Sequence, residues 1–208
     1  GRLRRESRRR EAEADRLPGA EPPLRLREDA LGARADRAAR EKLLRILETA
    51  LPRHAPPDSL VSLFFPAPKL PRFQQARDAL FRKAFAQIAA GRLAAGVRLV
   101  RGCGAGLTPA GDDFLCGWML ACRLRRQPAR AREILKRALG NNPVSNAFLE
   151  LSAQGHVNVA VKRLLQAPSS ARVQAVCAFG HSSGADLLCG VLWGVEERSE
   201  VGKDRPEF

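Results

Sequence analysis

The sequence predicts a mainly α-helical protein: a compact helical domain with two glycine-rich loops that each lead into a helix N-terminus, preceded by a poorly ordered basic arm. Two observations support this class. Apolar residues recur at helical spacing over most of the chain, and the breaks between these segments coincide with glycine or proline. A chain of 208 residues suits one domain of ordinary size, or a domain with an appendage.

The N-terminal part differs from the rest in composition. Residues 1–29 mix charges of both signs and end in a cluster of prolines, so we expect a poorly ordered arm there. One helix should follow from Asp36 to Leu51. Because the chain begins at Gly1 and its only methionine is Met119, we expect a fragment, or an N-terminus that is truncated or aberrantly read.

The expected organisation is therefore a basic, partly disordered arm with one helix over residues 1–58, a helical domain over 66–197 and a polar tail over 198–208. Residues 59–65 are apolar and short, and fit either a strand or an extended connector. A helix should begin after Pro71 and end at Gly91 and Gly96. Further helices are expected at 113–125, 129–139, 144–154, 156–166, 171–179 and from about 184 to 197.

Charge and composition narrow the function classes. The formal net charge of +14 favours anionic partners, either nucleic acid or small phosphorylated or carboxylated ligands. Aromatic residues make up only 5% of the chain, which leaves few stacking platforms for single strands, so nucleic acid is the less favoured partner. No apolar run is long enough to cross a membrane.

Five cysteines without a CxxC spacing indicate buried, reduced thiols rather than disulfides or a zinc site. The Arg-rich start has no apolar segment behind it and is not a secretory signal. We therefore expect a cytoplasmic protein.

An internal repeat is the most informative feature. The segment Gly111–Gly117 aligns without gaps on Gly184–Gly190 and shares five of its seven residues. Each copy follows a loop rich in small residues and opens a predicted helix. We expect Gly117 and Gly190 to allow close packing of helices.

The unpaired amides and the dipole at a helix N-terminus favour anions, and a loop without bulky side chains lets an anion reach the backbone. The alternative is capping without any ligand, because Ser183 and Asp186 have the spacing of a capping box. If Asp113 and Asp186 lie close together, they could hold Mg²⁺, or raise each other's pKa and transfer protons. His181 could donate to an anion or act as an acid or base.

The candidate catalytic residues are thus Asp113, Asp186 and His181. Candidate substrate-binding residues are Gly104, Gly106, Thr108, Gly111, Asp112, Ser182, Ser183 and Gly184. We assign no metal ligand and no cofactor, although Mg²⁺ is left open. His156 should be a loop or capping residue, and His54 lies in a proline-rich connector. The P-loop, the dinucleotide fingerprint and the GxSxG motif are all absent.

The string GAGLTPAGDDFLCG over residues 104–117, with Ser145 and then GHSSGAD over 180–186, resembles the bacterial AllH family. The resemblance covers about residues 66–197. It implies a subunit of an oxamate carbamoyltransferase in anaerobic purine-ureide breakdown, where oxalurate and phosphate interconvert with oxamate and carbamoyl phosphate. It also implies partner subunits, and a transferase rather than a hydrolase.

The sequence departs from the family pattern in three places. Ala110 stands where serine is expected, Asn142 stands where threonine is expected, and residues 1–60 match nothing in the family's N-terminal region. Two rival functions remain beside the carbamoyltransferase subunit. One is nonspecific nucleic-acid binding through the basic first 150 residues, and the other is a Mg²⁺-dependent hydrolase that uses the aspartates.

Overall fold

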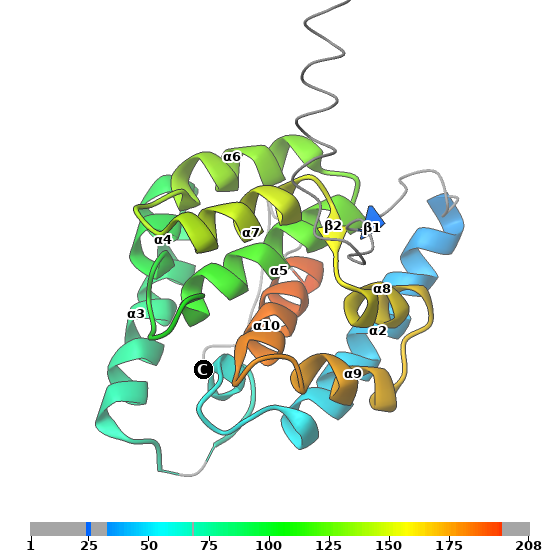
Figure 1. Ribbon diagram of the computed structural model, residues 1–208, viewed down its shortest axis with the longest axis horizontal. Helices are drawn as coiled ribbons and strands as arrows, with labels where there is room; N and C mark the ends of the chain where they lie inside the picture. The colour runs from blue at the N-terminus through cyan, green and yellow to red at the C-terminus, as the bar shows by residue number, and fades with distance from the viewer. Residues whose placement is uncertain (1–23, 26–32, 68, 197–208) are drawn as a thin grey trace, which may run out of the picture.

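The computed structural model describes residues 24–25, 33–67 and 69–196, and this part of the chain is mainly helical, as predicted (Figure 1). Most of the predicted N-terminal arm and the whole polar tail over 198–208 lie outside the described residues. The helices are α2 (Ala33–His54), α3 (Arg72–Ala89), α4 (Leu93–Val100), α5 (Ala110–Leu124), α6 (Pro128–Ala138), α7 (Pro143–Ala153), α8 (Val159–Gln166), α9 (Ser170–Cys177) and α10 (Ser183–Glu196), with a short 3₁₀ helix η1 (Leu60–Leu63). Two short strands, β1 (Leu24–Arg25) and β2 (His156–Val157), pair antiparallel.

Helices α5 and α10 cross at the centre of the molecule. Every residue of α5 from Gly111 to Cys122 is buried, as expected for a helix that is apolar on all sides. The crossing is close because a Cβ on Gly117 would strike the carbonyl oxygen of Leu187, and a Cβ on Gly190 would strike that of Phe114. The packing role predicted for both glycines is confirmed.

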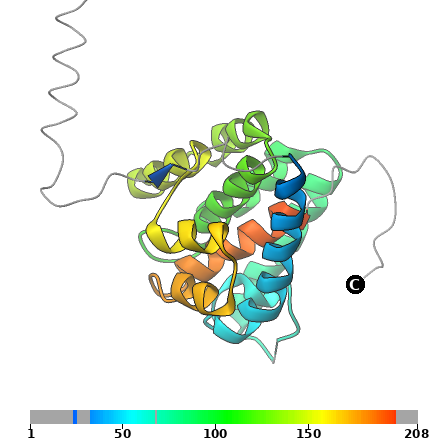
Figure 2. The same cartoon turned by 90° about the vertical axis from the view of Figure 1, so that its right-hand side faces the viewer.

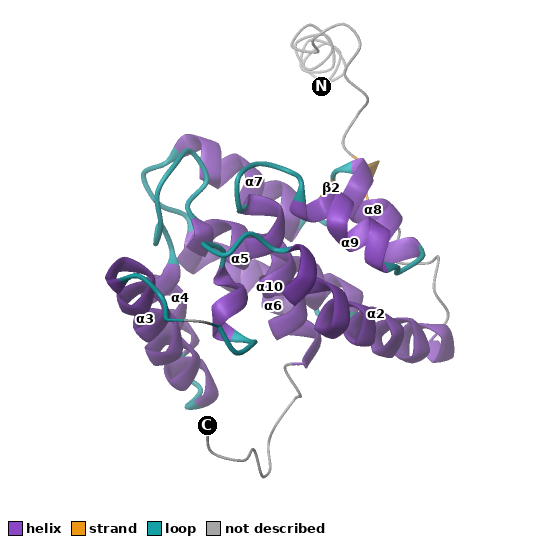
Figure 3. Cartoon of the chain, turned by 90° about the horizontal axis from the view of Figure 1, so that it is seen from below, coloured by secondary structure: helices purple, strands orange, loops and turns teal. Residues whose placement is uncertain are grey.

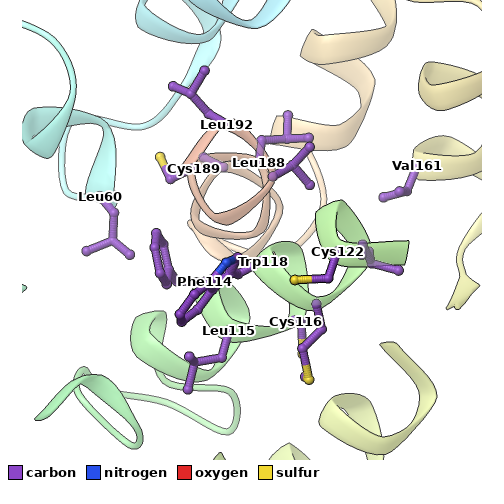
Figure 4. Close-up of a cluster of buried hydrophobic side chains, with 14 of the residues drawn as sticks. Leu60, Phe114, Leu115, Cys116, Trp118, Cys122, Val161, Leu188, Cys189 and Leu192 are labelled. Carbon is purple, nitrogen blue, oxygen red and sulfur yellow. The ribbon is translucent and has the colours of Figure 1, made fainter. Parts of the chain in front are cut away.

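The other helices cover this central pair. Helices α6 and α7 lie against α5, whereas α2 and α9 lie against α10 (Figure 2). Seen from below, α3 and α4 lie on one side of the crossing and α8 and α9 on the other (Figure 3). Leu60 of η1 belongs to the same core as Phe114 and Trp118 of α5 and Leu192 of α10 (Figure 4).

The sequence repeat extends to a pair of helix–loop–helix units, α4–α5 and α9–α10. In the first unit the Gly111 amide donates to the Cys103 carbonyl, at 2.8 Å between N and O. In the second the Gly184 amide donates to the Phe179 carbonyl, at 3.1 Å. A Cβ on Gly111 would strike the carbonyl of Val100, and one on Gly184 would strike that of Val176. Both units therefore solve the helix junction in the same way.

Several boundaries differ from those predicted. Gly96 does not end a helix but lies inside α4, where its missing side chain lets the Ala84 carbonyl and Ile88 come close. Residues 59–65 form neither a strand nor an extended connector, because Leu60–Leu63 is a 3₁₀ helix with Ser59 as its N-cap. Helix α8 begins at Val159 rather than at residue 156, since His156 and Val157 pair with β1.

Helix α2 belongs to the same core as the rest, with Leu43, Leu47 and Leu51 buried on one face. The domain boundaries proposed at residues 58 and 66 stay a prediction. Within the described residues, no helix combines the length and the apolar character needed to cross a membrane. All five cysteines are free; four are buried, and Cys103 is half-buried.

Candidate functional site

A pocket of about 400 Å³ lies where the two repeated loops meet α7, β2 and α8. Its walls are mostly valine, leucine and phenylalanine side chains from α5, α7, α8 and α9. The polar side chains that line it are those of Thr108, Asp113, Ser152, His156, Asn158 and Ser183. A concave, largely apolar pocket with a few polar groups is typical of a small-molecule site.

The two loops meet at this pocket, because Thr108 of the first and Ser183 after the second both line it. The hydroxyl oxygens of Thr108 and Ser183 are 3.1 Å apart and share a hydrogen bond. The first loop is also tied to α7, because the Asn142 side-chain amide donates to the Leu107 carbonyl at 2.8 Å. The same Asn142 caps α7 by accepting from the amides of Val144 and Ser145. Asn142, one of the two single residues that depart from the family pattern, thus has a structural role at the site.

Asp113 is the carboxylate that faces the pocket. Only 8% of the residue is exposed, and its Oδ2 atom is buried without a hydrogen-bond partner. Burial raises the pKa of Asp113 to about 7. Hydrogen bonds from Ser183 and Thr108 act to lower this pKa, whereas the negative charge of Asp186 raises it further. A carboxyl group with this pKa can hold or release a proton near neutral pH.

Asp186, the matching residue of the second unit, lies outside the pocket lining. It is fully buried, and its Oδ1 accepts the backbone amide of Leu60 at 2.7 Å. Burial raises the pKa of Asp186 to about 6, against the hydrogen bonds from Leu60 and Ser182 and the positive charge of Arg77. Its Oδ2 atom, like that of Asp113, is buried without a hydrogen-bond partner. The two aspartates therefore share an unpaired oxygen and differ in their neighbours, which are η1 for Asp186 and the pocket for Asp113.

Arg77 of α3 holds the segment that covers Asp186. Its guanidinium group donates to the Ser59 carbonyl at 2.9 Å and pairs with Asp78 at 3.0 Å. The Ser62 hydroxyl in turn donates to Asp78 at 2.6 Å. These contacts fix η1 over the start of α10.

The remaining predicted binding residues are mainly structural in their contacts. Asp112 accepts the Gly102 amide at 2.7 Å and so closes the first loop. Gly104 and Gly106 are exposed and have φ angles of 127° and 92°, which L side chains rarely adopt. The amides of Gly111 and Gly184 already donate to backbone carbonyls, so they are not free to bind an anion. Ser183 and Gly184 line the pocket, and Ser182 hydrogen-bonds to Asp186.

His181 lies on the surface rather than in the pocket lining. Its side chain is 84% exposed, and its Nε2 atom is 2.6 Å from Asp58 Oδ2. The structure does not bring it together with Asp113.

Sequence reasoning missed the part of the pocket that follows α7. His156 was expected to be a loop or capping residue, but it lines the pocket, and its Nδ1 atom is buried without a partner. Asn158 caps α8 through the Val161 amide, at 2.8 Å, and also lines the pocket. The alternation of His156 and Asn158 between two helices was the signal available, because residues two apart in an extended segment face the same side.

The charge of the pocket bears on what it can hold. Of the described residues that line it, none is lysine or arginine, and Asp113 is the one carboxylate. Within the described part of the chain, no three His, Cys, Asp or Glu side chains lie together in a way that could hold a metal ion. The pocket is therefore better suited to a group that pairs with a carboxyl than to a strongly charged anion.

Comparisons with known proteins agree with the resemblance noted in the sequence. Residues 100–195 match the family model described as oxamate carbamoyltransferase subunit AllH. No curated protein and no solved structure matches the chain. The matched segment runs from the end of α4 almost to the end of α10 and holds both loops and all the polar residues of the pocket. This segment of the chain belongs to the AllH family.

Proposed function

We propose that this protein is a subunit of an oxamate carbamoyltransferase-type complex and that its pocket holds the carbamoyl-bearing substrate. In the cytoplasmic reaction that we envisage, part of purine-ureide breakdown, oxalurate and phosphate give oxamate and carbamoyl phosphate. The observation that carries the proposal is Asp113, a buried carboxyl with an unpartnered oxygen that lines the largely apolar pocket within the AllH-matched segment.

Transfer of the carbamoyl group to phosphate requires a group that accepts and donates a proton. A phosphate oxygen forms a bond to the carbamoyl carbon, and the bond from that carbon to the oxamate nitrogen breaks. The departing nitrogen needs one proton, and hydrogen phosphate has one proton to give up. Asp113, with a pKa of about 7, can take the proton from phosphate and pass it to the nitrogen, so that it ends the reaction unchanged.

The phosphate site is the part that we assign to the partner subunits. Binding a dianion calls for arginine, lysine or free backbone amides. The described residues that line the pocket offer neither cation, and the Gly111 and Gly184 amides are engaged. The apolar walls exclude water and strengthen the electrostatic interactions of Asp113. Mg²⁺ remains a candidate ligand for the assembled complex.

The test is the reconstituted complex with Asp113→Asn in this subunit. We expect phosphate-dependent cleavage of oxalurate to fall by about 100-fold or more, because asparagine cannot carry the proton. Glu133→Gln, the same change at an exposed residue of α6, is the matched control and should retain wild-type activity. Full activity of Asp113→Asn would refute the role of this residue.

A further inference from the structure

Asp113 and Asp186 occupy equivalent places in the two helix–loop–helix units. The equivalence is structural as well as sequential: Gly117 packs against the Leu187 carbonyl, and Gly190 packs against the carbonyl of Phe114, the equivalent of Leu187. Each aspartate lies two residues after the glycine that touches the preceding helix. The group that binds the Asp186 carboxylate therefore indicates which kind of group can bind the Asp113 carboxylate.

The space in front of Asp186 is filled by the chain itself. The backbone N–H of Leu60 donates to Asp186 Oδ1 at 2.7 Å, and this contact joins residues 126 positions apart. Ser59 and Ser62, on either side of Leu60, are held by Arg77 and Asp78. One oxygen of this carboxylate thus accepts an amide N–H delivered by a separate segment, whereas its Oδ2 atom is buried without a hydrogen-bond partner.

The space in front of Asp113 has no such segment. In its place is the pocket, walled by α7, β2 and α8, and Asp113 Oδ2 is buried without a donor. A buried polar atom without a partner is destabilising, so a ligand that supplies the missing donor gains in affinity. His156 also lines the pocket, and its Nδ1 atom is likewise buried without a partner.

We propose that the ligand of this pocket presents an amide N–H to Asp113, as Leu60 does to Asp186, and that this contact makes the site select amides over carboxylates of the same shape. The inference rests on the proposed function, because it takes the pocket to be the substrate site. Its new content is the residue that recognises the nitrogen end of the substrate and the bond it makes. A carboxylate in the same position would bring two negative charges together in an apolar space and would be rejected.

Oxamate and oxalate are suitable probes, since they differ by one NH₂ group in place of one oxygen. In calorimetric titrations of the full chain at pH 8, we expect oxamate to bind at least about tenfold more tightly than oxalate. Asp113→Asn should reduce this preference to about threefold or less, because the asparagine amide can accept from one ligand and donate to the other. Glu133→Gln should keep the wild-type preference.

Three results would overturn the inference. Oxalate could bind as tightly as oxamate, the preference could survive in Asp113→Asn, or neither compound could bind at millimolar concentration. The pair succinamate and succinate extends the test to amides as a class.

The pH dependence of oxamate binding gives a measurement on the wild-type chain, which stands even if Asp113→Asn does not fold. The titratable groups around Asp113 are Asp112 and Cys116 on α5, Asp186 on α10 and His156 on β2. Because an ionised carboxylate is the better N–H acceptor, the affinity should rise about tenfold from pH 6 to pH 8. His156→Gln should retain this rise, and a flat or falling profile would contradict the inference.

Failure of this inference and failure of the proposed function give different results. Amide selectivity that depends on Asp113, without phosphate-dependent cleavage of oxalurate by the reconstituted complex, would leave the inference standing and remove the function. Cleavage without amide selectivity would do the reverse.

Discussion

The α4–α5 and α9–α10 units have the same backbone geometry where their two helices meet. They differ in the residues that surround their aspartates, Asp113 and Asp186. In both units a glycine at the start of the second helix touches the carbonyl of the first, and its amide closes the loop. In one unit the aspartate meets η1 and a buried arginine nearby; in the other it meets a pocket. The loops differ too, since the first carries three glycines at positive φ, Gly102, Gly104 and Gly106, and the second carries one, Gly180.

This difference shows that a local sequence can specify a local geometry without specifying a site. Gly-Asp-Asp at 111–113 and its repeat Gly-Ala-Asp at 184–186 place a carboxylate at the start of a helix in both units. Whether another segment covers that carboxylate or a pocket borders it depends on parts of the chain that are far away in sequence. Leu60 arrives from before α3, whereas the pocket walls come from α7 and α8.

The largest effect should come from breaking the crossing that relates the two units. Gly190→Val would push a branched side chain into the Phe114 carbonyl, with Trp118 next to it, and backbone cannot move aside cheaply. We expect the free energy of unfolding to fall by at least about 3 kcal/mol in urea denaturation. Gly117→Val should do the same, because its clash with Leu187 is the mirror of this one.

Gly140→Ala is the control for these variants. An added Cβ there meets nothing within 4 Å, so the change in stability should stay within about 0.5 kcal/mol. A Gly190→Val protein as stable as Gly140→Ala would show that the two helices are not held at the distance described.

A smaller effect on stability should distinguish Asp186, which η1 covers, from Asp113, which lines the pocket. Asp186→Ala leaves the Leu60 amide buried without an acceptor, which should cost about 2 kcal/mol. Asp113→Ala should cost less than about 1 kcal/mol, because the Thr108 and Ser183 hydroxyls can still pair with each other. Both are best measured at pH 5, where the two folded carboxyls are mostly protonated and ionisation in the unfolded chain affects the two variants almost equally, so the difference between them reports hydrogen bonds.

Asp186→Asn supplies the rescue for that comparison. Its side-chain oxygen can still accept from Leu60, so most of the stability lost in Asp186→Ala should return. Equal losses for Asp186→Ala and Asp113→Ala would mean that the Leu60 contact contributes nothing.

Features that depend on neighbouring residues can be predicted from the sequence, whereas contacts between segments far apart in the chain cannot. The helical class and the close packing at Gly117 and Gly190 followed from apolar spacing and from the repeat. Helix α4 was missed because Gly96 was interpreted as a helix end, although in the fold it relieves a contact with α3. Propensity cannot distinguish a glycine that ends a helix from one that packs against another helix.

The candidate site shows the same limit. Asp113, Thr108 and Ser183 were selected from the loops alone, and the structure does bring them together. The repeat predicts the same role for Asp186 as for Asp113. Nothing in the sequence around Asp186 indicates that η1 covers it. His156 was passed over because its neighbours in the pocket come from other elements.

The smallest expected effect concerns the charge of the open aspartate. The pKa of Asp113 is about 7 in the folded chain, against about 3.9 for an exposed aspartate, so the unfolded chain releases this proton first as the pH rises. The free energy of unfolding should therefore fall between these two values and level off above pH 7. From pH 6 to pH 8 the loss due to Asp113 is about 1 kcal/mol.

Asp113→Asn removes this contribution, so its stability should fall less than that of the wild type over the same range in urea titrations at pH 6, 7 and 8. Asp186, with a pKa of about 6, affects stability mainly below this range and is present in both proteins, so the difference between the two profiles isolates Asp113. Glu133→Gln should run parallel to the wild type, since that residue is exposed. Parallel profiles for Asp113→Asn and the wild type would mean that the pocket carboxyl ionises as it does in water, and the contrast between the open and the filled unit would lose its electrostatic basis.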